Sequence, residues 1–129
     1  MEEQPPKPTL KPLNWIGSSK ESLDAFPGPA RREAGYALYL AQIGTKAIKA
    51  KPLRGFGGAG VLEVVADYDG NAFRAVYTVK FAKAVFVLHA FQKKSKKGIT
   101  TPQAVIDLIK RRLKIAAAEN RRLYGSDKP

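Results

Sequence analysis

One dipeptide, Asp69-Gly70, constrains the fold of this chain more than any other feature. It joins two runs rich in β-branched and aromatic residues, at positions 61–68 and 71–81. Asp-Gly is favoured in the two-residue turn of a β-hairpin because both turn positions need a positive φ. A third run of this kind, at 84–92, follows a second short turn near Ala82-Lys83. The sequence therefore predicts a three-stranded antiparallel meander.

Helical patterns precede this meander. A loosely alternating stretch at 10–17 suits a short first strand, and Ser18 or Ser19 is placed to cap a helix through residue 26. A second helix is expected over 29–43, with proline in its first turn and glycine after its end. Residues 46–60 then form a long glycine-rich loop, whose basic residues are Lys46, Lys49, Lys51 and Arg54.

One further helix follows the meander. Thr100 or Thr101 is expected to cap it, with Pro102 in its first turn. Its apolar stripe consists of Ile106, Ile109, Leu113, Ala116 and Ala117. The whole pattern predicts a compact α+β fold, in which an antiparallel meander sheet is accompanied by two N-terminal helices and one C-terminal helix.

The length of 129 residues fits one domain, expected over 10–125, with a disordered proline-containing arm at 1–9 and a flexible tail at 126–129. The chain has no cysteine and one histidine, which argues against a thiolate zinc site, a cysteine nucleophile or a histidine-rich metal centre. We expect no metal and no cofactor. The longest apolar run, 84–91, is too short to cross a bilayer, so a cytoplasmic location is expected and no membrane partner.

Charge is distributed unevenly along the chain. Positions 1–69 hold 9 basic and 8 acidic residues, whereas positions 70–129 hold 14 basic and 3 acidic residues. A one-sided positive field favours a polyanion, because binding releases the counterions condensed on it. Nucleic acid is therefore the leading partner. The glycine-rich string at 55–60 precedes a strand rather than a helix, which argues against a dinucleotide-binding loop.

The predicted hairpin register gathers chemically useful side chains on one face of the sheet. The Asp69-Gly70 turn pairs residue 65 with Arg74 and Glu63 with residue 76, and either short second turn places His89 and Phe91 on the face of Arg74. Lys93 joins them if the third strand continues. The opposite face carries an apolar set expected to form the core: Leu62, Val64, Phe73, Ala75, Tyr77 and Val79.

These residue types suit RNA cleavage in which the ribose 2′-hydroxyl attacks its own phosphorus. Arg74 is expected to stabilise the phosphate, because its guanidinium fork matches phosphate oxygens. His89 or Lys93 is expected to act as the general base or acid, and Phe91 to stack on a nucleobase. Because this face should be accessible to solvent, Arg74→Ala is expected to abolish activity without unfolding the protein.

Each of these residues also has a structural interpretation. His89 is equally consistent with a hydrogen-bonded residue of an apolar strand, and Phe91 with the core. Glu63 and Arg74 lie diagonally on one face and are expected either to form an ion pair or to take part in phosphate binding. The run at 93–97 is interpreted as a polyanion contact through Lys93, Lys94, Lys96 and Lys97 rather than as a solvated turn.

The strings KPLRGFGGAGVLEV, FRAVYTV and VFVLHAFQKKSKKGITTP resemble the phage-derived branch of the RelE/HigB toxin superfamily, over about residues 11–123. The resemblance implies a RelE-like fold and a ribosome-dependent mRNA endonuclease, the toxic half of a type II toxin-antitoxin pair. It also implies a cognate antitoxin, usually with a helix-turn-helix domain, through which alone operator DNA is contacted. Arg54, Arg74 and the Lys93-Lys94 pair match the basic residues of that branch. RelE-type enzymes tend to use a tyrosine near the chain end, but no role is assigned to Tyr124.

Three rival classes remain open at this stage. A catalytically silent RNA-binding module needs only the basic patch, and a small DNA-binding regulator would bind duplex DNA as the isolated chain. A membrane-surface protein ranks third, because no expected helix combines a large apolar face with a purely basic polar one.

Overall fold

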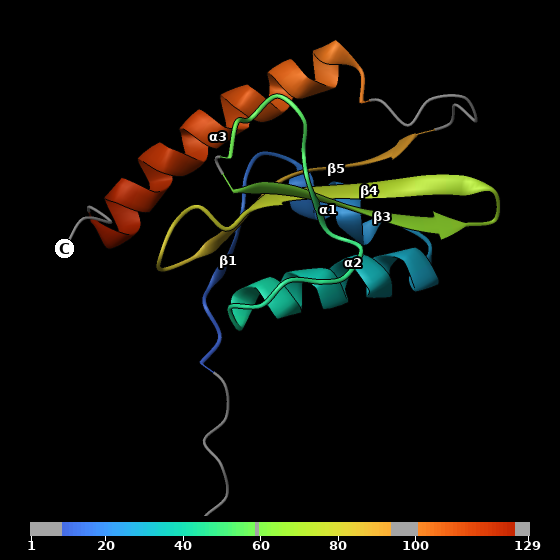
Figure 1. Cartoon of the computed structure of the whole chain (residues 1–129), viewed down its shortest axis with the longest axis horizontal. Helices are drawn as coiled ribbons and strands as arrows, with labels where there is room; N and C mark the ends of the chain where they lie inside the picture. The colour runs from blue at the N-terminus through green and yellow to red at the C-terminus, as the bar shows by residue number, and fades with distance from the viewer. Residues whose placement is uncertain (1–8, 59, 94–100, 126–129) are drawn as a thin grey trace, which may run out of the picture.

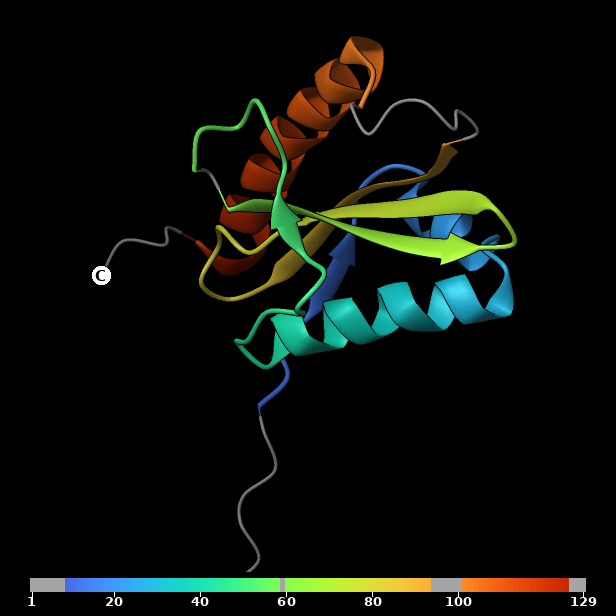
Figure 2. The same cartoon turned by 45° about the vertical axis from the view of Figure 1, so that its right-hand side comes forward.

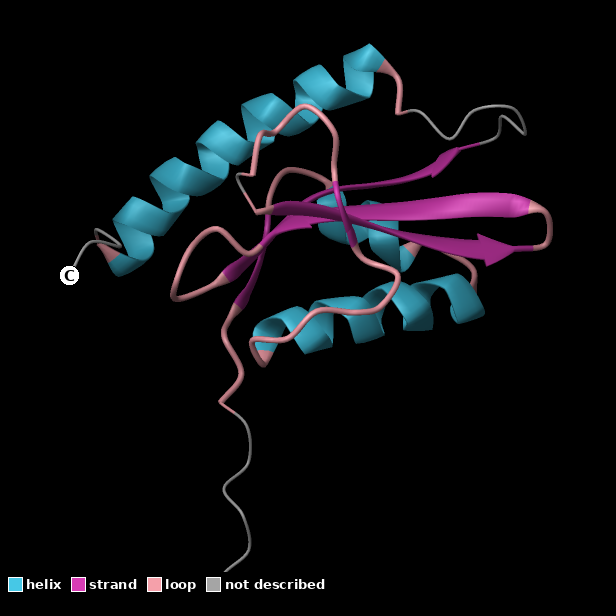
Figure 3. Ribbon diagram, viewed as in Figure 1, coloured by secondary structure: helices cyan, strands magenta, loops and turns pink. Residues whose placement is uncertain are grey.

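The computed structural model describes residues 9–58, 60–93 and 101–125, and it has an α+β fold (Figures 1 and 3). The helices and strands, in chain order, are β1 (Leu13–Trp15), α1 (Ser19–Asp24), α2 (Gly28–Gln42), β2 (Lys51–Pro52), β3 (Val61–Tyr68), β4 (Asn71–Thr78), β5 (Val85–Lys93) and α3 (Gln103–Tyr124). The strands form one five-stranded sheet in the order β1-β5-β4-β3-β2. The three predicted helices are all present. None of the helices in the described part of the chain is long and apolar enough to cross a membrane.

The central hairpin forms as its turn residues predict. Asp69 and Gly70 have φ values of 51° and 76°, which the two-residue turn requires. Tyr68 therefore pairs with Asn71, and the same register continues along both strands. It pairs Val65 with Arg74 and Glu63 with Val76, as predicted.

The second connection of the meander is longer than predicted. Strand β4 ends at Thr78 and β5 begins at Val85, so the expected two-residue turn and the extension of the strand to Phe81 are wrong. The N–H of Val79 still donates to the carbonyl of Gly60 beyond the end of β4, but its side chain is exposed rather than in the core. Phe81 instead turns inward and packs edge-on against Phe86.

A β-bulge between β4 and β5 restores the predicted pairing of Arg74 with Phe91. Tyr77 pairs with Val87 but Val76 pairs with His89, so one extra residue, Leu88, is accommodated between these pairs. Arg74 consequently lies opposite Phe91, which is the pairing predicted for an Ala82-Lys83 turn.

Both edges of the sheet differ from a simple meander. Strand β1 is shorter than the predicted segment and pairs in parallel with β5, which makes the sheet mixed. At the other edge, β2 forms within the segment expected to be a loop, and it pairs antiparallel with β3 over two residues. This edge segment continues past α3 (Figure 2).

Helices cover both faces of the sheet. Helices α1 and α2 pack on one face, which carries the predicted core residues Leu62, Val64, Phe73, Ala75 and Tyr77. On the other face, Ile106, Ile109 and Ala116 of α3 contact a second cluster that includes Val76, Phe86 and Leu88. Figure 1 shows α3 crossing the sheet on the side away from α2. The face expected to be accessible to solvent is therefore largely covered, because the apolar stripe of α3 needs an apolar surface to bury.

Candidate nucleic-acid interface

A cleft of about 500 Å³ opens beside the N-terminal half of α3. Its other wall is the edge segment, which we define as residues 51–55, that is β2 and the three residues after it. Glu63 of β3 lies between the two walls. Figure 2 shows this segment rising from β2 alongside α3. The lining residues are Lys51, Pro52, Leu53, Arg54, Gly55, Glu63, Thr101, Gln103, Ile106 and Lys110.

The cleft is basic at its rim. Lys51 and Arg54 come from the edge segment and Lys110 comes from α3, and all three are exposed. Glu63 is the carboxylate among the lining residues, and its side chain is 12% exposed. Exposed cations can contact the phosphates of a nucleic acid, and the recessed carboxylate can accept hydrogen bonds from its hydroxyl or amino groups. This arrangement makes the cleft the candidate nucleic-acid interface.

Arg74 lies beneath this cleft in a buried ion pair. Its Nη1 donates to Oε1 of Glu63 over 2.8 Å, and its side chain is only 7% exposed. The expectation that Arg74 would be accessible to solvent is therefore wrong. Of the two interpretations of the Glu63 and Arg74 diagonal, the ion pair is the one that the structure contains. Arg74 holds the Glu63 carboxylate in place, and its catalytic role stays a prediction.

Of the residues expected to cap helices, Thr100 lies outside the described residues, Ser19 is the first residue of α1 and donates to the carbonyl of Val87, and Ser18 and Thr101 contact other elements. Thr101 donates from its Oγ1 to Oε2 of Glu63 over 3.3 Å, and α3 begins after Pro102 without a side-chain cap. Ser18 precedes α1 without capping it, and its Oγ accepts a hydrogen bond from Nη2 of Arg112. Hydroxyl groups near a helix start have several possible partners, and tertiary contacts decide between them.

His89 is held by Arg112 of α3, on the β5 side of the covered face. Nη1 of Arg112 donates to the carbonyl of Leu88 over 2.9 Å and lies 3.2 Å from Nδ1 of His89. Since a guanidinium can only donate, Nδ1 accepts, and the neutral ring carries its proton on Nε2. Arg112 also lies against Gly17, where a Cβ would come within 3.0 Å of the guanidinium.

Burial, assisted by the positive charge of Arg112, lowers the pKa of His89 to about 4. At neutral pH the imidazole is therefore uncharged, and the Nδ1 lone pair is already engaged. To accept a proton from a ribose hydroxyl at Nδ1, His89 would have to release Arg112. The structural interpretation of His89 accounts for these contacts, and its catalytic role stays a prediction.

We expect the stability of the protein to fall as the pH drops from about 6.5 to about 4, through protonation of His89. The unfolded chain takes up this proton near pH 6.5, whereas the folded protein takes it up only near pH 4. Between these values the unfolded state binds more protons, so acid favours unfolding.

The chain has one histidine, so the His89→Gln variant removes this titration alone. Urea denaturation of both proteins at several pH values should show the stability difference shifting in favour of the variant as the pH falls. A difference independent of pH between 7 and 4 would contradict the neutral, Arg112-bound His89.

The remaining predicted site residues divide into three groups. Phe91 shares the face of Arg74, as predicted, but it packs against the α3 cluster and stacks on His89 with centroids 5.0 Å apart. Lys93 ends β5 opposite Ala72, which puts it on the same face. Lys94, Lys96 and Lys97 lie outside the described residues.

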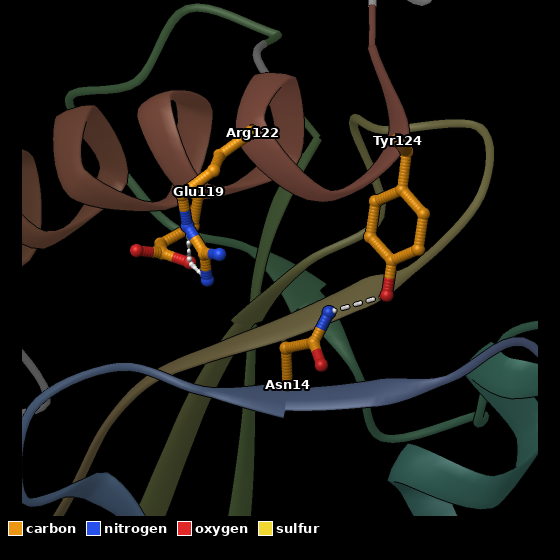
Figure 4. A network of polar contacts seen from close by, with 4 residues as sticks. All are labelled: Asn14, Glu119, Arg122 and Tyr124. Atoms are coloured by element: carbon orange, nitrogen blue, oxygen red, sulfur yellow. Dashed lines mark hydrogen bonds and ion pairs between the residues drawn. The ribbon is translucent and has the colours of Figure 1, made fainter.

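Tyr124 lies far from the cleft. Its hydroxyl accepts a hydrogen bond of 3.0 Å from Nδ2 of Asn14 in β1 (Figure 4). Tyr124 comes 14 positions after Lys110, which corresponds to about 21 Å along the axis of α3. In the same view Arg122 pairs with Glu119, three residues earlier in α3. Both contacts belong to the C-terminal end of α3 and not to the cleft.

The structure thus brings Arg54 and Glu63 together in the cleft, with Arg74 behind them. Sequence reasoning did not assign Thr101, Lys110 or Arg112 to the site. The basic triplet at 110–112 is a sequence signal for Lys110 and Arg112. Residues two positions apart on a helix point to different sides, so Lys110 can face the cleft while Arg112 contacts His89. Among the described residues, no group of three or more His, Asp or Glu side chains is gathered so that it could hold a metal ion.

A family model matches most of the chain. The model of a family described as phage-derived Gp49-like proteins matches residues 21–114, which extend from α1 to the middle of α3. The matched segment includes β2 to β5 and all the residues that line the cleft. A search of curated proteins gave no match.

Proposed function

Since the chain belongs to the phage-derived Gp49-like family, we propose that it is the toxin of a toxin-antitoxin pair and cleaves messenger RNA on the ribosome. The proposal joins this family membership to the sequence resemblance to RelE/HigB toxins. The five-stranded α+β fold is consistent with a RelE-like fold. The proposed site of action is the cytoplasm, where translating ribosomes are found.

The observation that carries the proposal is the basic cleft with a carboxylate in it. Lys51, Arg54 and Lys110 provide three exposed cations around Glu63 within about 500 Å³. A space of this size accepts about one nucleotide with its flanking phosphates. Cations at the rim contact phosphates, while a recessed carboxylate accepts from hydroxyl or amino groups.

The proposed chemistry uses the ribose 2′-hydroxyl as nucleophile, which attacks the adjacent phosphorus and expels the 5′-oxygen of the next nucleotide. Arg54 and Lys110 are the exposed cations of the cleft that stabilise the charged phosphate, and the buried Arg74 contributes by holding Glu63 in place. Glu63 accepts the hydroxyl proton at Oε2, which receives a 3.3 Å hydrogen bond from Thr101 while Arg74 holds Oε1. Lys93 remains the candidate donor of a proton to the leaving oxygen.

The partners of the proposed toxin follow from its class. They are messenger RNA on the ribosome and a cognate antitoxin with a helix-turn-helix domain. Operator DNA is contacted only through that antitoxin. A small helix-turn-helix protein encoded beside this gene would support this part of the proposal.

Inducible expression in a bacterial host tests the proposal. We expect growth arrest within a few generations, together with cuts at codon-related positions in translated messages. Expression of soluble protein without growth arrest and with intact messages would overturn it.

A catalytically silent RNA-binding module is the second candidate. It is favoured by the engagement of Arg74 with Glu63 and of His89 with Arg112, which commits two of the predicted catalytic groups to structural contacts. This candidate predicts binding of single-stranded RNA without cleavage. A DNA-binding regulator instead predicts tight binding to duplex DNA.

A further inference from the structure

A second hollow lies on the opposite face of the sheet from the basic cleft. It has a volume of about 380 Å³ and lies between α2 and the segment 46–49. Its walls are mainly apolar and include Tyr36, Leu40, Ile48 and Val64. Val64 follows Glu63 in β3, and neighbouring residues of a strand point to opposite faces. We call this hollow the α2 groove.

Ile48 at the rim of the α2 groove is a large apolar residue that the described part of the protein leaves uncovered. It is 100% exposed, at a central position of the turn that the hydrogen bond from the N–H of Ala50 to the carbonyl of Ala47 closes. The flanking alanines are buried and anchor the turn. Central turn positions favour Gly, Asn, Asp, Ser or Pro, so the fold gives no reason for isoleucine there.

Exposed aromatic rings extend this apolar surface along α2. Tyr36 is 62% exposed and Tyr39 is 42% exposed, and their rings stack with centroids 6.5 Å apart. Tyr36 and Ile48 both line the groove, and Tyr39 stacks beside Tyr36, so three large exposed side chains lie in or next to one concave site. Such a group on a soluble protein usually marks a binding surface for another protein.

The surrounding charge restricts what can occupy the α2 groove. Lys46 is exposed at the rim, Lys49 pairs with Glu33 over 2.6 Å, and the whole chain carries a net charge of +12. A second copy of the chain would bring equal positive charge to the contact. RNA would place phosphates against apolar walls and Glu33. An acidic protein segment with apolar side chains complements both the groove and the net charge.

The walls also restrict the backbone of the occupant. One wall is α2, whose backbone groups are already paired, and the other is a closed turn. Neither offers a row of backbone groups that an extended strand could pair with. A helix satisfies its own backbone, and it presents apolar side chains at intervals of three and four residues. We propose that the α2 groove binds an acidic amphipathic helix of a partner protein.

This inference concerns a different surface from the proposed nuclease site and does not depend on cleavage. A photo-crosslinking amino acid placed at position 48 in the full chain, in the natural host, identifies the occupant. The control places it at Ile115 of α3, which is also exposed, at 51%. We expect the first protein to crosslink to a helical, acidic and apolar segment of one partner, and the second not to do so.

The crosslinked segment is then synthesised as a peptide and titrated against the purified protein. The Ile48→Asp variant should weaken binding at least tenfold, and the Ile115→Asp variant less than twofold. Both should bind single-stranded RNA alike, because neither residue lines the cleft. The inference is overturned by crosslinks from position 48 to RNA, to a second copy or to a non-acidic segment. It is also overturned if there are no crosslinks, or if peptide binding is insensitive to Ile48→Asp.

Discussion

Replacing Arg74 with alanine is expected to destabilise the folded protein by about 3–5 kcal/mol, the usual effect of leaving one partner of a buried ion pair alone. Glu63 would keep its charge in a site that is only 12% exposed, without the guanidinium that now lies 2.8 Å from it. For a domain of this size the melting temperature should fall by about 10–20 °C. Urea denaturation with linear extrapolation measures the free energy of unfolding directly.

The double variant Glu63→Leu/Arg74→Met provides the matched control. It removes both charges and fills the space with apolar groups, so its stability should return to within about 2 kcal/mol of the wild type. Both variants should lack the proposed nuclease activity. If the stable double variant is also inactive, the loss of activity comes from the missing side chains and not from unfolding. An Arg74→Ala protein as stable as the wild type would show that the ion pair does not support the fold.

The second large effect is expected at the cleft. The variant Arg54→Glu/Lys110→Glu should bind single-stranded RNA at least about 100-fold more weakly, since a charge-assisted hydrogen bond contributes about 1.5–3 kcal/mol and the new carboxylates repel phosphate. Both side chains are exposed at the rim, so the fold should be retained. Fluorescence anisotropy with a labelled RNA of twelve nucleotides at several salt concentrations measures the effect. The salt dependence should become shallower by about 0.7 for each lost phosphate contact.

A control with the same change in net charge is Arg32→Glu/Lys83→Glu. These two residues are exposed and do not line the cleft. This control should bind RNA within about fivefold of the wild type, through the loss of general attraction alone. If both double variants weaken binding equally, the positive charge acts as a diffuse field and the cleft is not the binding site.

Local sequence signals account for much of the fold. The Asp69-Gly70 turn determined the hairpin register, and therefore the positions of Glu63 and Arg74 on one face. Phe91 shares that face because the bulge at Leu88 offsets the longer second connection, which the sequence did not predict. The stripe of α3 predicted which side of that helix is buried. It did not predict which sheet face the helix covers, since that depends on contacts between residues distant in sequence. A continuous apolar run such as Val85–Leu88 is typical of a strand covered on both faces, and β5 is such a strand.

The candidate site depended more on tertiary contacts. A long loop gives no spacing from which the approach of Arg54 to Glu63 can be predicted. Arg112 reaches His89 across 23 positions of sequence, and Thr101 donates to Glu63 across 38. The sequence shows that Thr101 is a hydroxyl residue near the start of a helix and that Arg112 is a basic residue within it, but not what each one contacts. The partner that each one takes is decided when α3 packs on the sheet.

The most direct test of the proposed function is a reconstituted translation reaction with purified protein and a defined message. We predict cuts only in messages engaged by ribosomes, with a 2′,3′-cyclic phosphate on one side and a 5′-hydroxyl on the other. A single 2′-deoxy substitution at the cut nucleotide should abolish cleavage there, because it removes the nucleophile. Intact messages in the presence of folded protein, or cuts that persist at the 2′-deoxy position, would contradict the account.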